Sequence, residues 1–326
     1  MAALCSEHPG CPGIGRSIKG LLARRALRMN HSTFQKIFWH QIPPTRVGVF
    51  SGRIHCPCEV QFWDMMDRFF PDVVGKTLLD VGCGPGVKAL TFALAGAHVT
   101  GFDVRESAIH HALENTRQIR QQQAHKFIEA QFFHHNIERG FSQIETASVD
   151  IVLFVEVIEH LRQYELVLAE IRRILKPDGS VVITTPNKDF QGNRAEHDEA
   201  VYGEKAFGHV REFDPDGLAE AMRNAGLQIT WQGFMNPPTS TDFCRWIHPW
   251  MIRDHGFLQQ KEGIEDVIGI RTLGFLQPLY NLFFPMISWC IKGYNSFFFP
   301  MLYRLASQKN LAQKSGKTLL AIGTPS

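Results

Sequence analysis

Three glycines directly after a short apolar segment constrain this chain more than any other feature. Residues 77–81, Thr-Leu-Leu-Asp-Val, are followed by Gly82, Gly84 and Gly86. Glycine adopts backbone conformations with positive φ, so this spacing predicts a strand that ends in a tight turn, with a helix beginning near Gly86. The backbone N–H groups of such a turn and helix N-terminus favour ligand binding at the edge of a parallel sheet.

The segments around this loop alternate between two hydrophobic periodicities. Three- and four-residue spacing predicts helices, and short continuous apolar runs predict strands. The predicted helices cover residues 59–70, 88–95, 107–123, 164–175 and 214–225, and the predicted strands cover 77–81, 98–102, 131–133, 150–155, 180–185, 228–234 and 317–323. A turn is expected at residues 176–179, Lys-Pro-Asp-Gly. Because strand–helix–strand units form right-handed parallel crossovers, we expect an α/β, Rossmann-like sheet of seven strands, mostly parallel, with helices on both faces.

Composition divides the chain into four regions. Residues 1–57 are a basic, partly ordered N-terminal arm, since residues 8–58 contain eight Lys or Arg and no acidic residue. Residues 58–235 carry the alternating pattern, residues 236–316 form an apolar helical insertion, and residues 317–326 add the last strand. We expect a cytoplasmic protein, because the N-terminal region has no secretory hydrophobic segment and the seven cysteines form no disulfide pattern. Basic arms also occur as membrane-surface helices and transit peptides, so membrane association and a mitochondrial location are the alternatives. Met29 is a second candidate for the natural start.

The insertion contains an uncharged stretch, residues 272–291, whose length approaches that of a membrane span. Pro278 and Pro285 would break a continuous helix there. The interpretations are a helical cap over the functional site, a hairpin on a membrane surface, and a true span. The first two suit a hydrophobic small-molecule partner. The formal net charge of +2 gives no support for a nucleic-acid partner, and the sequence indicates no oligomeric state.

Two acidic residues flank the glycine loop. Asp80 precedes the glycines, and Asp103 ends the next predicted strand. An acid before the loop would repel the pyrophosphate of a dinucleotide, but it could accept hydrogen bonds from the α-ammonium group of an amino acid. An acid at the end of the second strand is placed to bind ribose hydroxyls. The alternative is an unrelated Rossmann fold, since glycine turns are common.

Residues 76–235, with this loop and these acids, resemble class I S-adenosylmethionine (SAM)-dependent methyltransferases. The resemblance implies that SAM is the cofactor. The SAM-binding residues it implies are Asp80, Gly82, Cys83, Gly84 and Gly86 around the methionine end, Asp103 at the ribose, Val104 against the adenine, Asn136 with Ile137 near the adenine amino group, and Glu156 beneath the methionine part. The family usually has Asp where this chain has Asn136.

A second motif, Glu-Val-Ile-Glu-His at residues 156–160, closes the fourth predicted strand, and His209 precedes the last predicted helix. Ligands bind where parallel strands end, and carboxylates and imidazoles coordinate divalent metals. Glu156, Glu159, His160 and His209 are therefore candidate ligands for Mg or Mn. Without a metal, His160 is the candidate general base, with Glu159 as the second catalytic residue.

This motif resembles two branches of the family. Ubiquinone-biosynthesis O-methyltransferases have a similar Glu-x-x-Glu-His run and a later His before a Phe. Small-RNA 3′-end 2′-O-methyltransferases share the run and the Thr-Pro-Asn segment at residues 185–187, and hold a metal with two acids and two histidines. We expect in-line O-methylation of a lipophilic small molecule, a quinone precursor or lipid-like compound. A metal-dependent RNA methyltransferase and a non-catalytic SAM-fold subunit are the alternatives.

Overall fold

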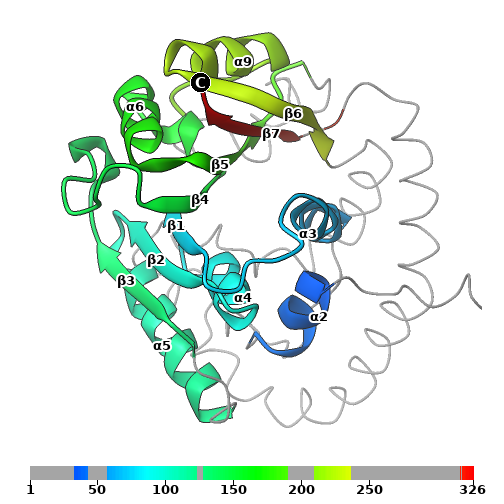
Figure 1. Ribbon diagram of the computed structural model, residues 1–326, viewed down its shortest axis with the longest axis vertical. Helices are drawn as coiled ribbons and strands as arrows, with labels where there is room; N and C mark the ends of the chain where they lie inside the picture. The colour runs from blue at the N-terminus through cyan, green and yellow to red at the C-terminus, as the bar shows by residue number, and fades with distance from the viewer. Residues whose placement is uncertain (1–32, 43–56, 123–127, 190–208, 236–315, 317) are drawn as a thin grey trace, which may run out of the picture.

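The computed structural model describes residues 33–42, 57–122, 128–189, 209–235, 316 and 318–326 (Figure 1). Its helices are α2 (Thr33–His40), α3 (Pro57–Phe69), α4 (Val87–Leu94), α5 (Glu106–Gln122), α6 (Tyr164–Ile174) and α9 (Pro215–Asn224), with short 3-10 helices η1 (Ile137–Arg139) and η2 (Ile158–His160). Its strands are β1 (Thr77–Val81), β2 (His98–Asp103), β3 (Ala130–His134), β4 (Val149–Val155), β5 (Leu175–Pro186), β6 (Leu227–Met235) and β7 (Thr318–Pro325).

The seven strands form one sheet in the order β3-β2-β1-β4-β5-β7-β6 (Figure 1). The pairs β1–β2, β1–β4, β2–β3 and β4–β5 are parallel, whereas β7 is antiparallel to both of its neighbours. The predicted mostly parallel, Rossmann-like fold is therefore confirmed. The chain moves outward from β1 to β3 and then crosses to β4 on the other side of β1. Ligands of such sheets bind beyond the strand ends at this reversal.

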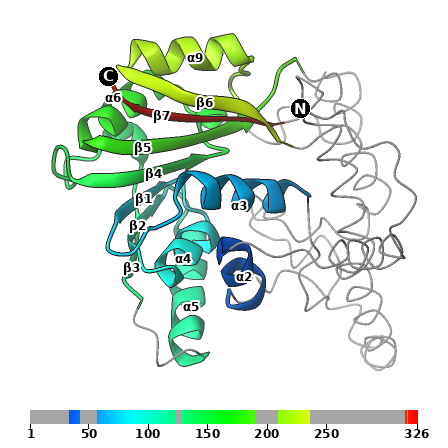
Figure 2. The ribbon, with the colours of Figure 1, turned by 45° about the vertical axis from the view of Figure 1, so that its right-hand side comes forward.

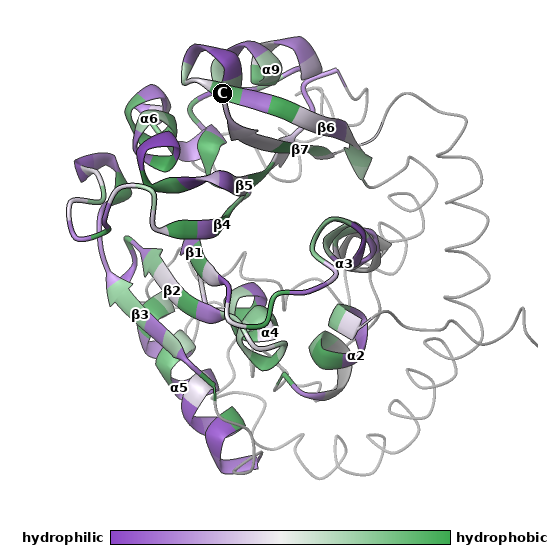
Figure 3. Cartoon of the chain, viewed as in Figure 1, coloured by the Kyte–Doolittle hydropathy of each residue, from purple (hydrophilic) through white to green (hydrophobic). Residues whose placement is uncertain are grey.

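Alternation along the strands creates a core on each face of the sheet. Leu78 of β1 joins a cluster with residues of α2, α3, α4 and α5, and Leu79 joins a second cluster with residues of α6 and α9. The helices therefore cover both faces, with α3 and α9 on opposite sides of the sheet (Figure 2). α5 buries residues at three- and four-residue spacing, including Ile109, Ala112 and Ile119, and turns its hydrophilic side outward (Figure 3).

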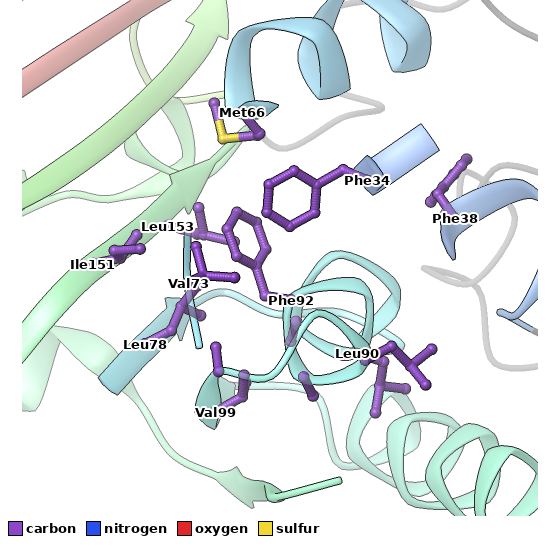
Figure 4. Close-up of a cluster of buried hydrophobic side chains, with 14 of the residues drawn as sticks. Phe34, Phe38, Met66, Val73, Leu78, Leu90, Phe92, Val99, Ile151 and Leu153 are labelled. Carbon is purple, nitrogen blue, oxygen red and sulfur yellow. The ribbon is translucent and has the colours of Figure 1, made fainter. Parts of the chain in front are cut away.

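One helix of the N-terminal region packs directly against this domain. Phe34 of α2 stacks on Trp63 of α3 at 5.7 Å between ring centroids. Its ring centroid also lies 4.5 Å from that of Phe92 on α4 (Figure 4). Both carboxylate oxygens of Asp67 on α3 accept from the Phe34 backbone N–H, which satisfies a donor at the start of α2. Residues 33–42 of the predicted arm are thus part of the core. Residues 1–32 and 43–56 lie outside the described residues.

The predicted turn at residues 176–179 is wrong as a break between helix and strand, because β5 runs from Leu175 through Pro186. The pairing explains the discrepancy. Val149 of β4 pairs with Leu175, but Ile151 pairs with Ser180, so the register shifts across the intervening residues. The Lys-Pro-Asp-Gly segment forms an irregularity within a longer strand instead of a connection before one.

The last strand, β7, lies between β5 and the edge strand β6. The preceding segment, residues 236–315, lies outside the described residues. The predicted cap, membrane-surface hairpin or membrane span in this segment therefore stays a prediction. Within the described ranges, no helix combines the length and the hydrophobicity needed to cross a membrane.

Candidate methyl-donor and acceptor site

The loop after β1 is shaped by glycines with different surroundings. A Cβ on Gly82, whose φ is +80°, would lie 2.4 Å from Cγ2 of Val157, so only glycine permits this packing. At Gly84, with φ +53°, the nearest atom to a Cβ would be Nη2 of Arg105 at 3.9 Å. Gly86 is the left-handed N-cap residue of α4. The loop is therefore packed tightly against the end of β4 at Gly82 and open at Gly84, as a ligand cradle requires.

Asp103, at the end of β2, holds this loop in place. Its Oδ2 accepts from the Gly84 N–H at 2.8 Å, and its Oδ1 accepts from the Arg105 N–H at 2.9 Å and from Arg105 Nε at 3.3 Å. The side chain is buried, and Oδ2, which accepts one of these three bonds, can accept a further hydrogen bond. The predicted ribose ligand thus also links the ends of β1 and β2. The sequence pattern does not indicate this second role.

Asp80 is buried within β1, close to the glycine loop. Burial raises the pKa of its carboxyl group to about 7, with the Lys88 charge opposing the shift and the Asp103 charge adding to it. A buried carboxyl group of this kind favours a cationic partner, and the α-ammonium group of SAM is one. The neighbouring Cys83 remains a neutral thiol, because burial raises its pKa far above the ordinary value.

The residues predicted near the adenine lie at the adjacent ends of β2 and β3. Val104 is 58% exposed directly after β2, and Ile137 is buried in η1. Asn136 is the N-cap residue of η1, where its Oδ1 accepts from the Glu138 N–H at 3.0 Å. An adenine amino group would therefore share this oxygen with the cap, a requirement that the sequence does not reveal.

The Glu-x-x-Glu-His motif separates its two acids. Glu156 follows β4 with a left-handed backbone, φ +55°, and its Oε1 accepts from Thr184 Oγ1 at 2.8 Å. Glu159 is 1% exposed, and its Oε2 accepts from Thr185 Oγ1 at 3.2 Å. Among the described residues, its Oε1 has no hydrogen-bond partner. Burial first, and the Glu156 charge second, raise the pKa of Glu159 well above its ordinary value.

His160 and His209 meet at this carboxyl group. Their rings lie edge to face at 4.8 Å, and His160 Nε2 lies 3.9 Å from Glu159 Oε1. The Val210 N–H donates to the Glu159 carbonyl at 2.9 Å, and Arg211 donates to the carbonyls of Leu161 and Arg162. These bonds hold the His209 segment against η2. The sequence pattern pointed to both histidines but carried no signal for Arg211.

Three of the four predicted metal ligands lie together. One ligand atom from each of Glu159, His160 and His209 lies within 4.8 Å of the others, and Glu156 is outside this group in the described part of the chain. Neighbouring ligands around a divalent ion at about 2.1 Å are about 3 Å apart, so these atoms would have to approach each other to bind one. A carboxylate with two imidazoles suits Mn or Zn better than Mg.

Similarity to known proteins agrees with this arrangement. The model of the methyltransferase domain family matches residues 58–232, more than half of the chain. The ubiquinone biosynthesis O-methyltransferase of Aromatoleum aromaticum is 30% identical over 210 residues, which cover 57% of this chain and 82% of that protein. The protein of the same name from Idiomarina loihiensis is 31% identical over 156 residues, 47% of this chain and about half (53%) of its own length.

Among solved structures, phosphoethanolamine N-methyltransferase 2 of Haemonchus contortus, in complex with SAM, has a TM-score of 0.49 at 18% identity. That match covers 90% of this chain and 60% of the other, and it carries no conclusion about function. The match to the family model and the similarity to the Aromatoleum protein establish the family of this chain. The chain therefore belongs to the methyltransferase domain family, as a class I SAM-dependent methyltransferase of the ubiquinone biosynthesis O-methyltransferase branch.

Proposed function

We propose that this enzyme methylates a hydroxyl group of a lipophilic small molecule, of the phenolic quinone-precursor class. One observation carries the proposal: Val157 packs against Gly82, so the segment from Glu156 to His160 adjoins the donor loop. A base and a methyl donor held side by side are what O-methylation requires. The names of the relatives, ubiquinone biosynthesis O-methyltransferases, support the acceptor class.

On the donor side, the buried Asp80 and the open backbone at Gly84 fit the methionine end of SAM, and Asp103 fits its ribose. SAM supplies a methyl group already activated by a sulfonium. The protein's contribution is then chiefly orientation, which can supply about 7–11 kcal/mol of the barrier. The loop suits this task because Asp103 holds Gly84 in place before any ligand binds.

On the acceptor side, we assign proton removal to His160. Its side chain is 34% exposed, so a hydroxyl group can reach it, and the buried Glu159 lies behind it at 3.9 Å. An imidazole titrates near neutral pH and suits a phenol, whose proton is weakly acidic. Burial raises the pKa of Glu159 and favours its neutral form, but the imidazolium that forms beside it would favour the ionised carboxylate, which would in turn stabilise the imidazolium.

The test is methyl transfer from labelled SAM to a short-chain prenylated catechol, together with calorimetry of SAM binding. We expect His160→Gln to lower kcat at least tenfold without changing the Kd for SAM. His111→Gln, on the exposed side of α5, is the matched control. Full activity of His160→Gln would refute the assigned base, and failure of the wild type to bind SAM would refute the donor assignment. SAM binding without turnover on any acceptor would favour a non-catalytic subunit.

The histidine cluster supports a second possibility at the same site, a divalent metal held by Glu159, His160 and His209. Such an ion would bind the acceptor oxygen and lower its pKa, as metals do for bound water. Electron paramagnetic resonance of added Mn²⁺, with and without Glu159→Gln, tests this directly. Turnover that is indifferent to EDTA would exclude a required metal. RNA ending in a 2′-hydroxyl belongs in the acceptor panel, because metal-dependent transfer to it would favour the RNA alternative.

We also propose that a membrane surface supplies the lipophilic acceptor. The support is the uncharged stretch at residues 272–291 with Arg271 and Lys292 beside it. Liposome flotation of the intact chain, compared with a chain lacking residues 270–305, tests this. Equal flotation of both would refute it.

A further inference from the structure

Two adjacent threonines at the end of β5 each bind a different acid of the Glu-x-x-Glu-His motif. Thr184 Oγ1 donates to Glu156 Oε1 at 2.8 Å and accepts from the Glu156 N–H at 3.2 Å. Thr185 Oγ1 donates to Glu159 Oε2 at 3.2 Å. Both threonines are completely buried. Each hydroxyl proton is therefore directed to a carboxyl group.

The pleat of the strand explains how neighbours reach different partners. Val182 belongs to the core on the α4 face of the sheet, and Ile183 belongs to the core on the α6 face. Because side chains alternate, Thr184 and Thr185 point to opposite faces in the same way. Glu156 and Glu159 are consequently held on separate sides of the end of β5. This separation reduces the repulsion between two acids that are three residues apart.

The bond from Thr185 fixes more than the place of Glu159. A carboxyl group rotates about its last bond, and holding one oxygen fixes the direction of the other. Oε2 is held by Thr185, and Oε1 is the buried atom that faces His160 Nε2 at 3.9 Å. Loss of the hydroxyl would leave both oxygens of this buried group without a hydrogen-bond partner among the described residues, so the group would turn toward another donor.

We infer that Thr185 is a positioning residue for acceptor activation: its hydroxyl sets the orientation of Glu159 that presents Oε1 to His160. Thr184 does the corresponding work for Glu156 and keeps that acid out of the histidine cluster. The inference rests on the proposed function, because it takes Glu159 and His160 as the acceptor side of the site. It gives Thr185, the first residue of the Thr-Pro-Asn segment, the role of orienting Glu159.

The test compares Thr185→Val with Thr185→Ser in the full-length enzyme. Valine keeps the branched shape and strand preference but lacks the hydroxyl, and serine keeps the hydroxyl. Supporting residues of this kind change activity by about 10–100-fold when lost. We expect that loss in kcat for Thr185→Val, an unchanged Kd for SAM, and recovery to within about threefold in Thr185→Ser. Thr116→Val removes another buried hydroxyl, on α5, and is the matched control.

Crystal structures of the two variants supply a readout that needs no acceptor. We expect the Glu159 carboxyl group to rotate away from His160 in Thr185→Val and to keep its place in Thr185→Ser. An unmoved carboxyl group in Thr185→Val would overturn the inference, and so would unchanged kcat after rotation or equal loss in both variants. If the wild type turns over no catechol, the proposed acceptor fails, and the crystal structures alone decide whether Thr185 orients Glu159.

Discussion

The buried carboxyl group of Asp80 predicts a conflict between stability and donor binding. Its pKa of about 7, against an ordinary value of 3.8, means that the folded protein resists ionising it. Three pKa units correspond to about 4 kcal/mol, since one unit is about 1.4 kcal/mol. SAM brings the cation that would offset this penalty. The unliganded enzyme should therefore be less stable at alkaline pH than the Asp80→Asn variant.

The pH dependence of the free energy of unfolding follows from proton binding to Asp80. Between pH 3.8 and about 7 the folded protein holds a proton on Asp80 that the unfolded chain has released. The contribution of this group to the free energy of unfolding is thus fully present below its unfolded pKa and is lost as pH rises through about 7. Asp80→Asn removes the titration. We expect it to raise the free energy of unfolding by up to about 4 kcal/mol near pH 8, relative to its effect near pH 4.

Urea unfolding of the unliganded proteins at several pH values measures this difference. Asp178→Asn, on the exposed part of β5, is the control for loss of a carboxylate. Asp80→Asn should weaken SAM binding, although it stabilises the unliganded protein. Affinity of the wild type should fall about tenfold per pH unit below about pH 7, and Asp80→Asn should bind about 100-fold or more weakly at pH 8. Parallel stability curves for wild type and Asp80→Asn across this range would refute the reasoning.

Three further changes test other parts of the structure. Gly82→Ala places a Cβ against Val157 at a φ of +80°, so we expect the free energy of unfolding to fall by about 1–3 kcal/mol and the Tm to fall with it. An unchanged Tm in thermal unfolding would contradict this packing. Arg211→Met removes the hydrogen bonds that hold the His209 segment, so proteolysis near this segment should accelerate while SAM affinity stays constant. Burial acts against ionisation of Asp150, but hydrogen bonds from Lys176 and the Thr77 N–H outweigh it, so the pKa of Asp150 is lowered. The ionised Asp150 therefore stabilises the folded protein above its ordinary pKa, and this stabilisation is lost as pH falls. Asp150→Asn should therefore cost about 1.5–3 kcal/mol at neutral pH, and that cost should shrink in acid; equal costs in urea unfolding at both pH values would count against the pairing.

Local pattern was sufficient for most of the fold, whereas the residues of the site stay a prediction. The strand before Gly82 and the helix after Gly86 follow from apolar spacing and glycine chemistry, and the structure has both. The irregularity at residues 176–179 did not follow, because Pro-Asp-Gly predicts a turn wherever it stands, and only pairing with β4 shows that the strand continues. The packing of α2 was equally out of reach. It depends on contacts of Phe34 with residues far along the chain.

The different environments of the residues in the Glu-x-x-Glu-His motif could not be predicted from the sequence for a related reason. Sequence spacing does not distinguish the two acids, so Glu156 and Glu159 are predicted alike as metal ligands with His160 and His209, and the metal-free alternative makes His160 the base with Glu159 as the second catalytic residue. The structure gives each a different environment, because β5 presents one hydroxyl to each face. Glu156 lies outside the cluster of Glu159, His160 and His209. His209 belongs to a distant segment, which hydrogen bonds from the Val210 N–H and from Arg211 hold against η2. Partners that come from other strands leave no trace in local spacing.

In the proposed reaction, the contact between Gly82 and Val157 connects the methyl-donor site with the acceptor site. The donor loop is fixed from β2 by Asp103, and the acceptor motif is fixed from β5 by the two threonines. Each half could therefore be held rigidly and still be misaligned with the other. The absence of a side chain at Gly82 lets Val157 pack directly on the loop, so the positions of donor and base depend on one another. Methyl transfer needs its reacting atoms in line within a few tenths of an ångström to gain the full effect of orientation. A cavity at this contact, made by Val157→Ala, should accordingly lower kcat more than it weakens SAM binding, whereas equal losses would place Val157 in donor binding alone.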